Sequence, residues 1–162
     1  MEAPLFAGNR QAGRGQMEEF IARLNAAGVR YVVIGGQAVR LHGMPRFSMD
    51  WDLLIPARDD ENFRRLNAAV GEWIEEPVVA MGPRGENFVQ TFQTRYGVVQ
   101  FHLAVPGIAS FDGAESAAVE IPLENGMPCR VLSAEDLLQA KLAAGRSQDQ
   151  LDAEFLKEKQ RN

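Results

Sequence analysis

The sequence predicts an α/β fold (α+β in class), in which helices pack against a small mixed β-sheet. The first observation is a β-branched run, residues 32–34, followed by a short helical pattern and a second apolar run, residues 51–55. The second is a set of later apolar runs separated by turn residues at Tyr96-Gly97 and Asn125-Gly126, which is typical of β-hairpins. A strand–helix–strand opening followed by hairpins implies a mixed sheet covered by helices.

Helices are predicted where apolar residues recur every three or four positions. In the last predicted helix, Leu151, Phe155 and Leu156 are expected to face inward. Ser133 is expected to cap the preceding helix, with Asp136 at the capping-box position. The predicted helices cover Met17–Ala27, Gly36–His42, Asp59–Val70, Ala134–Ala144 and Gln148–Lys159.

Strands are predicted where short apolar runs are bounded by turn residues. Pro56 is expected to end the second strand, because proline cannot donate a ladder hydrogen bond. No element is predicted between residues 106 and 118. The predicted strands cover Arg30–Ile34, Trp51–Ile55, Phe88–Thr94, Val98–Val105, Val119–Ile121 and Cys129–Leu132.

The composition is that of one ordinary globular domain. The chain has 162 residues, of which 46% are hydrophobic and 24% charged, and both fractions are near globular averages. We expect a single domain over residues 17–162, preceded by a poorly ordered lead-in over residues 1–16 that lacks the hydrophobic core of a signal peptide. No apolar run is long enough to span a membrane.

The charge and the cysteine content exclude some classes of protein. A formal net charge of −5 argues against strong nonspecific nucleic-acid binding, which usually requires a basic face, although a local basic rim around a nucleotide pocket is compatible with it. Cys129 is the single cysteine, so internal disulfides are excluded. A lone cysteine fits a reducing cytosol, and we therefore expect a cytoplasmic protein in which Cys129 is inert packing.

The most informative side chains are Asp50 and Asp52. In a strand, side chains two residues apart project from the same face, so these two carboxylates are expected to lie a few ångströms apart. Such a pair repels and raises its own pKa values unless a cation lies between them. Hard oxygen ligands suit Mg²⁺, whose coordination is usually completed by substrate phosphates. The pair therefore predicts a divalent metal site.

Gly35 and Gly36 predict an anion site beside that pair. A Gly-Gly turn between a strand and a helix lets backbone amides approach a phosphate closely and point at it. One short segment therefore offers both a phosphate cradle and a pair of metal ligands.

This arrangement resembles the nucleotidyltransferase superfamily that includes polymerase β, whose shared motif is a Gly-Gly or Gly-Ser turn, a short helix and Asp-x-Asp. More narrowly, the sequence is similar to the AbiEii-type branch, which contains minimal nucleotidyltransferases and toxins of toxin–antitoxin pairs. The matching segments are residues 31–39, His42-Gly43, Arg46, Ser48, residues 50–54, Val105-Pro106-Gly107 with Phe111, residues 131–137, Lys141, Gly145-Arg146, Asp149 and Asp152.

The resemblance implies a polymerase-β-like fold, an NTP substrate and a divalent cofactor, Mg²⁺ or Mn²⁺. It makes Asp50 and Asp52 the catalytic metal ligands. Arg46 would neutralise the triphosphate or steady the aspartates, and Ser48 would contact phosphate or cap the turn. The residues implied to bind the nucleotide are Gly35, Gly36, Arg46, Ser48 and Lys141, and those implied to hold the last helices against the sheet are Arg146, Asp149 and Asp152.

Each of these residues also has a plainer interpretation. The glycine pair is compatible with a simple tight turn, and the two aspartates with exposed surface carboxylates. His42 is interpreted as a helix-end residue. Lys141 and Arg146 taken alone are typical of solvated cations. Asp149 and Asp152, three apart on one helix face, are expected to pair with Arg146 and a nearby lysine.

Gln100 departs from the superfamily pattern. The third catalytic carboxylate of the superfamily would lie on a neighbouring strand, and that position falls on Gln100 here. Glutamine cannot ionise, although its carbonyl oxygen can coordinate weakly. His102 lies two residues on, on the same strand face, and is the candidate base. No Asp or Glu lies between Asn87 and Phe111.

These observations support two main hypotheses. In the first, the chain is an enzyme that transfers an NMP group from an NTP to an acceptor that is a protein, an RNA end or a small molecule. In the second, it is a catalytically weak or inactive relic that binds a nucleotide or a partner; a carboxylate such as Glu86 or Glu120 folding into the site would favour the enzyme. A third possibility is one half of a toxin–antitoxin pair. The chain is short for the added helical region with which many superfamily members grip substrate, which is compatible with a homodimer or a partner protein.

Overall fold

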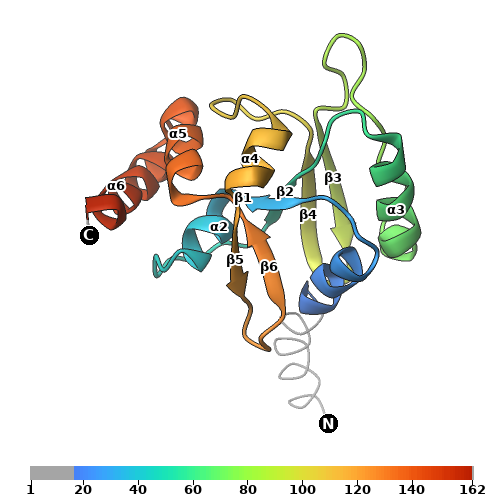
Figure 1. Cartoon of the computed structure of the whole chain (residues 1–162), viewed down its shortest axis with the longest axis horizontal. Helices are drawn as coiled ribbons and strands as arrows, with labels where there is room; N and C mark the ends of the chain where they lie inside the picture. The colour runs from blue at the N-terminus through green and yellow to red at the C-terminus, as the bar shows by residue number, and fades with distance from the viewer. Residues whose placement is uncertain (1–16, 162) are drawn as a thin grey trace.

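The computed structural model describes residues 17–161, and their six strands form one mixed sheet (Figure 1). The expected lead-in, residues 1–16, lies outside the described residues. The strands lie in the order β3-β4-β2-β1-β6-β5. Their bounds are β1 Val32–Ile34, β2 Trp51–Leu54, β3 Val89–Thr94, β4 Gly97–His102, β5 Val119–Pro122 and β6 Pro128–Val131.

Parallel and antiparallel pairs both occur in this sheet. Strand β1 runs antiparallel to β2 and parallel to β6, and β2 runs parallel to β4. The hairpins β3/β4 and β5/β6 supply the remaining antiparallel pairs. The prediction of a mixed sheet with hairpin-like later strands is confirmed.

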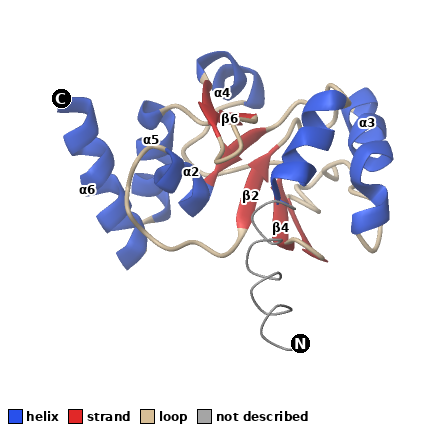
Figure 2. Cartoon of the chain, turned by 90° about the horizontal axis from the view of Figure 1, so that it is seen from below, coloured by secondary structure: helices blue, strands red, loops and turns tan. Residues whose placement is uncertain are grey.

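Helices cover the sheet from two sides. The helix over residues 17–26 and α3 lie on one side, and α5 and α6 lie together on the opposite side (Figures 1 and 2). The labelled helices are α2 Gly35–Leu41, α3 Asp60–Val70, the 3₁₀ turn η1 Gly71–Trp73, α4 Phe111–Ala117, α5 Ala134–Ala144 and α6 Ser147–Arg161.

Capping residues mark where two of the helices begin or end. The hydroxyl of Ser133 accepts a hydrogen bond from the backbone N–H of Asp136 at 3.1 Å, so the predicted cap of α5 is confirmed. Gly145 ends α5 in the left-handed conformation, with φ +70°. His42 is the C-cap of α2, as expected, and its Nε2 lies 2.8 Å from the carbonyl oxygen of Leu132. Burial lowers the pKa of His42.

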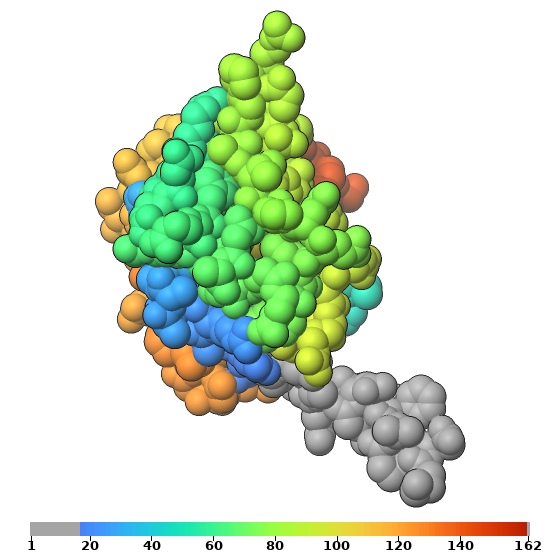
Figure 3. Space-filling view, turned by 90° about the vertical axis from the view of Figure 1, so that its right-hand side faces the viewer, coloured from blue at the N-terminus to red at the C-terminus, as the bar shows by residue number. Residues whose placement is uncertain are grey.

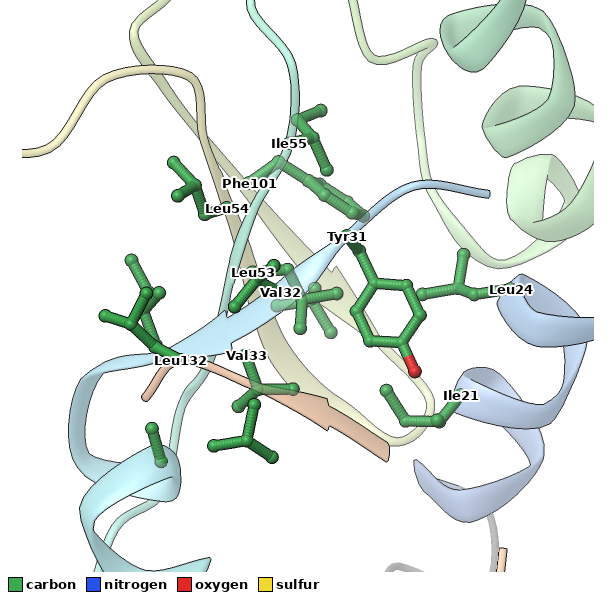
Figure 4. Packing of buried hydrophobic residues seen from close by; sticks show 14 of the residues in the cluster. Ile21, Leu24, Tyr31, Val32, Val33, Leu53, Leu54, Ile55, Phe101 and Leu132 are labelled. Carbon is green, nitrogen blue, oxygen red and sulfur yellow. The ribbon is translucent and has the colours of Figure 1, made fainter. Parts of the chain in front are cut away.

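The hydrophobic core lies around β1, which is buried along its whole length (Figure 4). Tyr31, immediately before β1, points toward Ile21 and Leu24 of the first helix, while Leu53 and Phe101 come from the neighbouring strands β2 and β4. The phenol of Tyr31 is not left unpaired, because its hydroxyl donates to Asn25 Oδ1 at 2.8 Å. The β-branched run of the sequence is therefore the centre of the sheet.

The expected inward face of α6 is partly wrong. Leu156 is buried, but Leu151 is 60% exposed. The inward stripe of α6 instead contains Asp149 and Asp152 together with Ala153. Carboxylates occupy these positions because they meet buried cations, so hydropathy alone gave the wrong helix face.

Helix α4 was not predicted. Ser110 begins it, since the Ser110 side chain accepts a hydrogen bond from the backbone N–H of Gly113. Arg30 attaches it to the rest of the protein, with its guanidinium 2.8 Å from Asp112 Oδ1 and 2.9 Å from Glu115 Oε1. The segment lacks apolar periodicity, so its sequence does not predict a helix. Its contact with Arg30, far away in the sequence, holds it against the rest of the protein.

The segment between η1 and β3 stands out from the surface (Figure 3). A turn closes it, in which the backbone N–H of Gly82 donates to Glu86 O and the backbone N–H of Arg84 donates to the Glu86 carboxylate. No helix among residues 17–161 is both long and apolar enough to cross a membrane.

Candidate active site

Gly35 lies where β1 meets α2 and faces Asp52 directly. Its φ is +71°, a left-handed conformation that favours glycine. A Cβ atom built there would lie 2.5 Å from Asp52 Oδ2. Ile34 pairs with Asp52 in the sheet register, which explains the proximity. The backbone at this turn and the Asp52 carboxylate therefore adjoin without a side chain between them.

Asp50 lies directly before strand β2, and Asp52 is the second residue of that strand. Asp52 is paired with Ile34 on one side and with Gln100 of β4 on the other, so it lies at the centre of the sheet. Asp50 precedes the strand by one residue. Both line one pocket of about 470 Å³.

That pocket is where most of the candidate residues meet. Gly35, Asp50, Asp52, His102 and Lys141 all line it. The sheet forms its floor, and α5 with the start of α6 forms a wall. Its other lining residues are Ile34, Phe88, Val89, Gln100, Ala104, Val105, Pro106, Leu137, Ala140, Ala144, Arg146 and Asp149.

His102 contacts Asp52 directly. The distance from His102 Nε2 to Asp52 Oδ1 is 2.9 Å, and both side chains are about one-fifth exposed. An ionised carboxylate can only accept here, so Nε2 carries a proton, and in the neutral imidazole Nδ1 is the nitrogen left to accept one. Asp52 thereby fixes the tautomer of His102.

Gln100 occupies the position next to Asp52 at which the superfamily pattern expects a carboxylate. It is paired with Asp52 in the parallel register of β2 and β4, and it lines the pocket. Glu86 lies in the projecting turn, and Glu120 lines a separate pocket with Arg30 and Arg130. Within residues 17–161, no three His, Cys, Asp or Glu side chains are grouped to hold a metal. No third carboxylate from the described chain replaces the missing one.

Gly36, Arg46 and Ser48 lie together beside the pocket rather than in its lining. A Cβ atom at Gly36 would lie 2.6 Å from Ser48 Oγ and 3.1 Å from Arg46 Nη2. Gln37 secures the loop, since its Nε2 donates to Ser48 O at 2.8 Å. Arg46 then extends to α6, where its Nη1 lies 2.7 Å from Asp152 Oδ2. Of these three residues, only Arg46 reaches a charged group.

A buried ionic network joins α5, α6 and the loop before β2. Lys141 Nζ lies 3.2 Å from Asp149 Oδ1 and 3.0 Å from Asp152 Oδ2. Lys141 is 7% exposed, so its interpretation as a solvated cation is wrong. Asp149 and Asp152 are fully buried and pair with Arg146 and Lys141, as expected from their spacing.

The network also sets the charge of Asp149. Burial by itself would raise the pKa of this carboxyl, but hydrogen bonds from Arg146 and Lys141 outweigh burial and hold the pKa below its ordinary value. Asp149 is therefore ionised at neutral pH, and the buried cations keep their counter-ions.

The pocket has an apolar wall, whose residues the sequence did not lead us to predict as part of the site. Leu137, Ala140 and Ala144 recur along α5 at helical spacing and line the wall beside Lys141. That spacing is the signal that could have identified them. Phe88, another lining residue, is 54% exposed and carried no such signal, because it precedes a strand at the sheet edge.

Comparisons with known proteins agree with this architecture. A family model described as "Nucleotidyl transferase AbiEii toxin, Type IV TA system" matches residues 19–151. No curated protein matches the sequence significantly.

Solved structures of similar fold include three proteins below 20% identity, so the likeness is one of fold. A candidate nucleotidyltransferase from Thermotoga maritima has a TM-score of 0.62 and 19% identity, over 88% of this chain and 91% of that one. An antigenic nucleotidyltransferase-like protein from Paracoccidioides brasiliensis has a TM-score of 0.58 and 17% identity, over 90% and 75%. The antibiotic-resistance factor ANT(2'')-Ia has a TM-score of 0.57 and 16% identity, over 88% and 83%.

Proposed function

We propose that this chain, which belongs to the nucleotidyl transferase AbiEii toxin family, transfers an NMP group from an NTP to an acceptor in a reaction that depends on Mg²⁺ or Mn²⁺. The observation that supports this most directly is the shared pocket of Asp50, Asp52 and Gly35. The pocket places two carboxylates beside a turn that carries no side chain, at the centre of the sheet.

The donor set of the pocket fits a hard divalent cation. Asp50 and Asp52 would hold it, and the carbonyl oxygen of Gln100 is a further oxygen donor beside Asp52. When bound, such a cation would offset the charge of the triphosphate in the transition state. A triphosphate and two carboxylates otherwise repel one another, so the charge of the pocket supports metal dependence.

The protein's own side chains would orient the nucleotide and take the proton. Gly35 would let the phosphates approach the backbone, and Lys141, paired with Asp149 and Asp152, would stay in the wall of the pocket beside them. In the transfer, the acceptor oxygen bonds to the α-phosphorus and the bond to the pyrophosphate oxygen breaks. His102 Nδ1 would accept the proton of the acceptor hydroxyl while Nε2 stays bound to Asp52.

Gln100 favours a second candidate function. With glutamine in register with Asp52, the proposed metal site has two carboxylates, Asp50 and Asp52, where the superfamily pattern has three. Such a pocket would bind a metal–nucleotide complex without turnover and regulate a protein partner, as one half of a toxin–antitoxin pair would. We also propose that the chain is cytoplasmic. In the first function it would meet its acceptor there, and in the second it would meet its partner protein or a second copy of itself.

Calorimetric titration tests the site. ATP, GTP, CTP and UTP are titrated with and without Mg²⁺ or Mn²⁺ into the wild type, into Asp50→Asn/Asp52→Asn and into Asp60→Asn/Glu154→Gln. The last variant removes two exposed carboxylates outside the pocket and serves as the charge control. We expect metal-dependent binding to be lost in the pocket variant alone; equal binding by all three proteins would refute the proposed site.

Pyrophosphate release separates the two functions. With α-labelled NTP and candidate acceptors, the enzyme function predicts covalent label transfer and one pyrophosphate per transfer, both abolished in Asp50→Asn/Asp52→Asn. Tight, metal-dependent binding with no pyrophosphate release from any acceptor class would instead support the regulatory function.

A further inference from the structure

We propose that Arg146 is the residue that clamps the β- and γ-phosphates of the nucleotide, an inference that rests on the proposed function. The family resemblance gives Arg146 only a structural role and implies phosphate contacts for Arg46 and Lys141. The ionic network around the pocket reverses that assignment.

The charges of the buried network balance without Arg146. Asp149 and Asp152 supply two negative charges, and Lys141 and Arg46 supply two positive ones. Lys141 contacts both carboxylates and Arg46 contacts Asp152, so these cations already have counter-ions in the protein. Buried ions need such pairing, and neither cation is in surplus for a ligand.

Arg146 adds one positive charge to this balanced network, and its side chain lies at the pocket. Its side chain is 79% exposed although it is hydrogen-bonded to a carboxylate that is 1% exposed. It lines the same pocket as Asp50 and Asp52. Asp149 first, and Asp52 and Asp152 more weakly, raise the pKa of Arg146. The guanidinium thus lies within the electrostatic range of Asp52, one of the two proposed metal ligands.

Three hydrogen bonds to a single buried carboxylate, that of Asp149, hold Arg146 in position. Asp149 Oδ2 accepts from the backbone N–H of Arg146 at 3.1 Å and from its Nε at 2.7 Å, and Asp149 Oδ1 accepts from Nη2 at 3.4 Å. Gly145, in the left-handed conformation, sets the direction of the chain just before it. Among the described residues, Nη1 of Arg146 has no hydrogen-bond partner.

This geometry suits a phosphate more than a base or an acceptor hydroxyl. A guanidinium held at Nε presents its far edge as a planar fork of N–H donors, which matches the oxygens of a phosphate. Prior fixation lowers the entropy lost when the ligand binds. Because the α-phosphate must reach the two aspartates to react, the phosphates left to face Arg146 are the β and γ.

The test compares nucleotides that differ only in phosphate number. ATP, ADP and AMP, or the corresponding set of whichever base the wild type binds best, are titrated in Mg²⁺ into the wild type, Arg146→Gln and Arg146→Lys. We expect Arg146→Gln to weaken NTP binding roughly ten- to hundredfold, as for loss of a charged hydrogen bond, and NMP binding less than twofold. Arg146→Lys should restore part of the preference for NTP over NMP, because it restores the charge but not the fork.

Arg161→Gln is the matched control. Arg161 is exposed, is the last residue of α6, the helix that begins directly after Arg146, and pairs with an acid three residues away, as Arg146 does, but it lies outside the pocket. It should leave all three affinities unchanged. Thermal melting of each variant without nucleotide measures the structural effect of the lost Asp149 contact separately.

The outcomes separate this inference from the proposed function. If the wild type binds no nucleotide, the proposed function is wrong, and the proposed role of Arg146 is refuted with it. If the wild type binds NTP and Arg146→Gln binds it equally well, or loses NTP and NMP binding by the same factor, the clamp alone is refuted. A lower melting temperature with an unchanged preference for NTP over NMP would assign Arg146 a purely structural role.

Discussion

At the scale of single residues, Gly35 determines whether the pocket can keep its shape. In Gly35→Ala, the new methyl group would lie 2.5 Å from Asp52 Oδ2, and the backbone at φ +71° would be strained by about 1–2 kcal/mol. Because Asp52 must then move, we expect metal-dependent nucleotide binding to be lost together with part of the stability. Calorimetry and urea denaturation measure the two effects.

Gly126→Ala separates strain from collision. Gly126 has φ +85° and no atom within 4 Å of its would-be Cβ, so it shares the strain of Gly35 but not the contact with Asp52. This variant should lose about 1 kcal/mol of stability and keep nucleotide binding. If Gly35→Ala also keeps binding, the proposed closeness of the turn to the reacting phosphates is wrong.

Gln100 gives the second prediction at this scale. Gln100→Glu would place a third carboxylate in register with Asp52. Without metal, like charges should lower the melting temperature by a few degrees, since about 1 kcal/mol corresponds to roughly 2–4 °C for a chain of this size. With Mg²⁺ the loss should reverse, and the metal should raise the melting temperature more than in the wild type.

Gln93→Glu is the control for that experiment. Gln93 is an exposed residue of the edge strand β3 and does not line the pocket. Its variant should show no metal-dependent change in melting temperature. A Gln100→Glu protein that responds to Mg²⁺ no more than Gln93→Glu does would show that position 100 does not face the metal.

At the scale of elements, the attachment of α6 depends on Asp152. This carboxylate accepts from Arg46, Lys141 and Gln148, and it is fully buried. In Asp152→Asn, the shape is kept but Arg46 loses its charge partner. Removing one partner of a buried ion pair costs about 3–5 kcal/mol, so we expect a loss of that order in the free energy of unfolding.

Glu154→Gln on the same helix is the comparison. Glu154 pairs with Lys157 at the surface, with a side chain that is 70% exposed, and its loss should change the free energy of unfolding by less than about 0.5 kcal/mol. Equal stabilities of the two variants in urea would mean that the buried network does not hold α6 in place.

Sequence periodicity predicted the elements that carry an apolar stripe and missed those that do not. Helix α5 and its Ser133 cap follow from local pattern alone. Helix α4 is held by Arg30, whose partners Asp112 and Glu115 are more than 80 residues away, and no local pattern reports such a contact. Leu151 was predicted to face inward because hydropathy does not show which residues pair with buried cations. In the structure Asp149 and Asp152 face inward instead, where they pair with Lys141.

For the candidate site, local motifs predicted which residues to examine, and the fold determined how they are used. The spacing of Asp50 and Asp52 anticipated their common pocket, and the strand position of Gln100 anticipated its place beside Asp52. The pairing of Arg46 with Asp152 spans 106 residues and could not be read from either segment. The resemblance implies a structural role for Arg146, and the charge balance on which the proposed clamp rests is visible only when the whole network is known.

At the scale of the whole molecule, the sheet buries the single cysteine where it reports global unfolding. Cys129 lies on β6, is fully buried, and burial raises its pKa to about 12. At pH 8 to 9 the native thiol is therefore neutral, whereas an unfolded thiol is partly ionised and reactive. We expect disulfide-exchange labelling of the native protein to be at least about 10³-fold slower than that of the urea-unfolded chain.

An exposed thiol calibrates the measurement. Cys129→Ser/Ser116→Cys moves the cysteine to the surface of α4 and should be labelled quickly in the native state. As urea is added, labelling of Cys129 should follow the loss of secondary structure. Fast labelling of Cys129 at zero urea would mean that β5 and β6 open independently of the rest of the sheet.

The buried network also sets the order in which the protein becomes competent during its synthesis. Arg46 and Lys141 are made before their acidic partners, which lie on α6. Until α6 has left the ribosomal exit tunnel, these two cations lack counter-ions and the wall of the pocket cannot close. The strands, with Asp50 and Asp52, can assemble earlier, but a nascent chain has no finished pocket until α6 has docked.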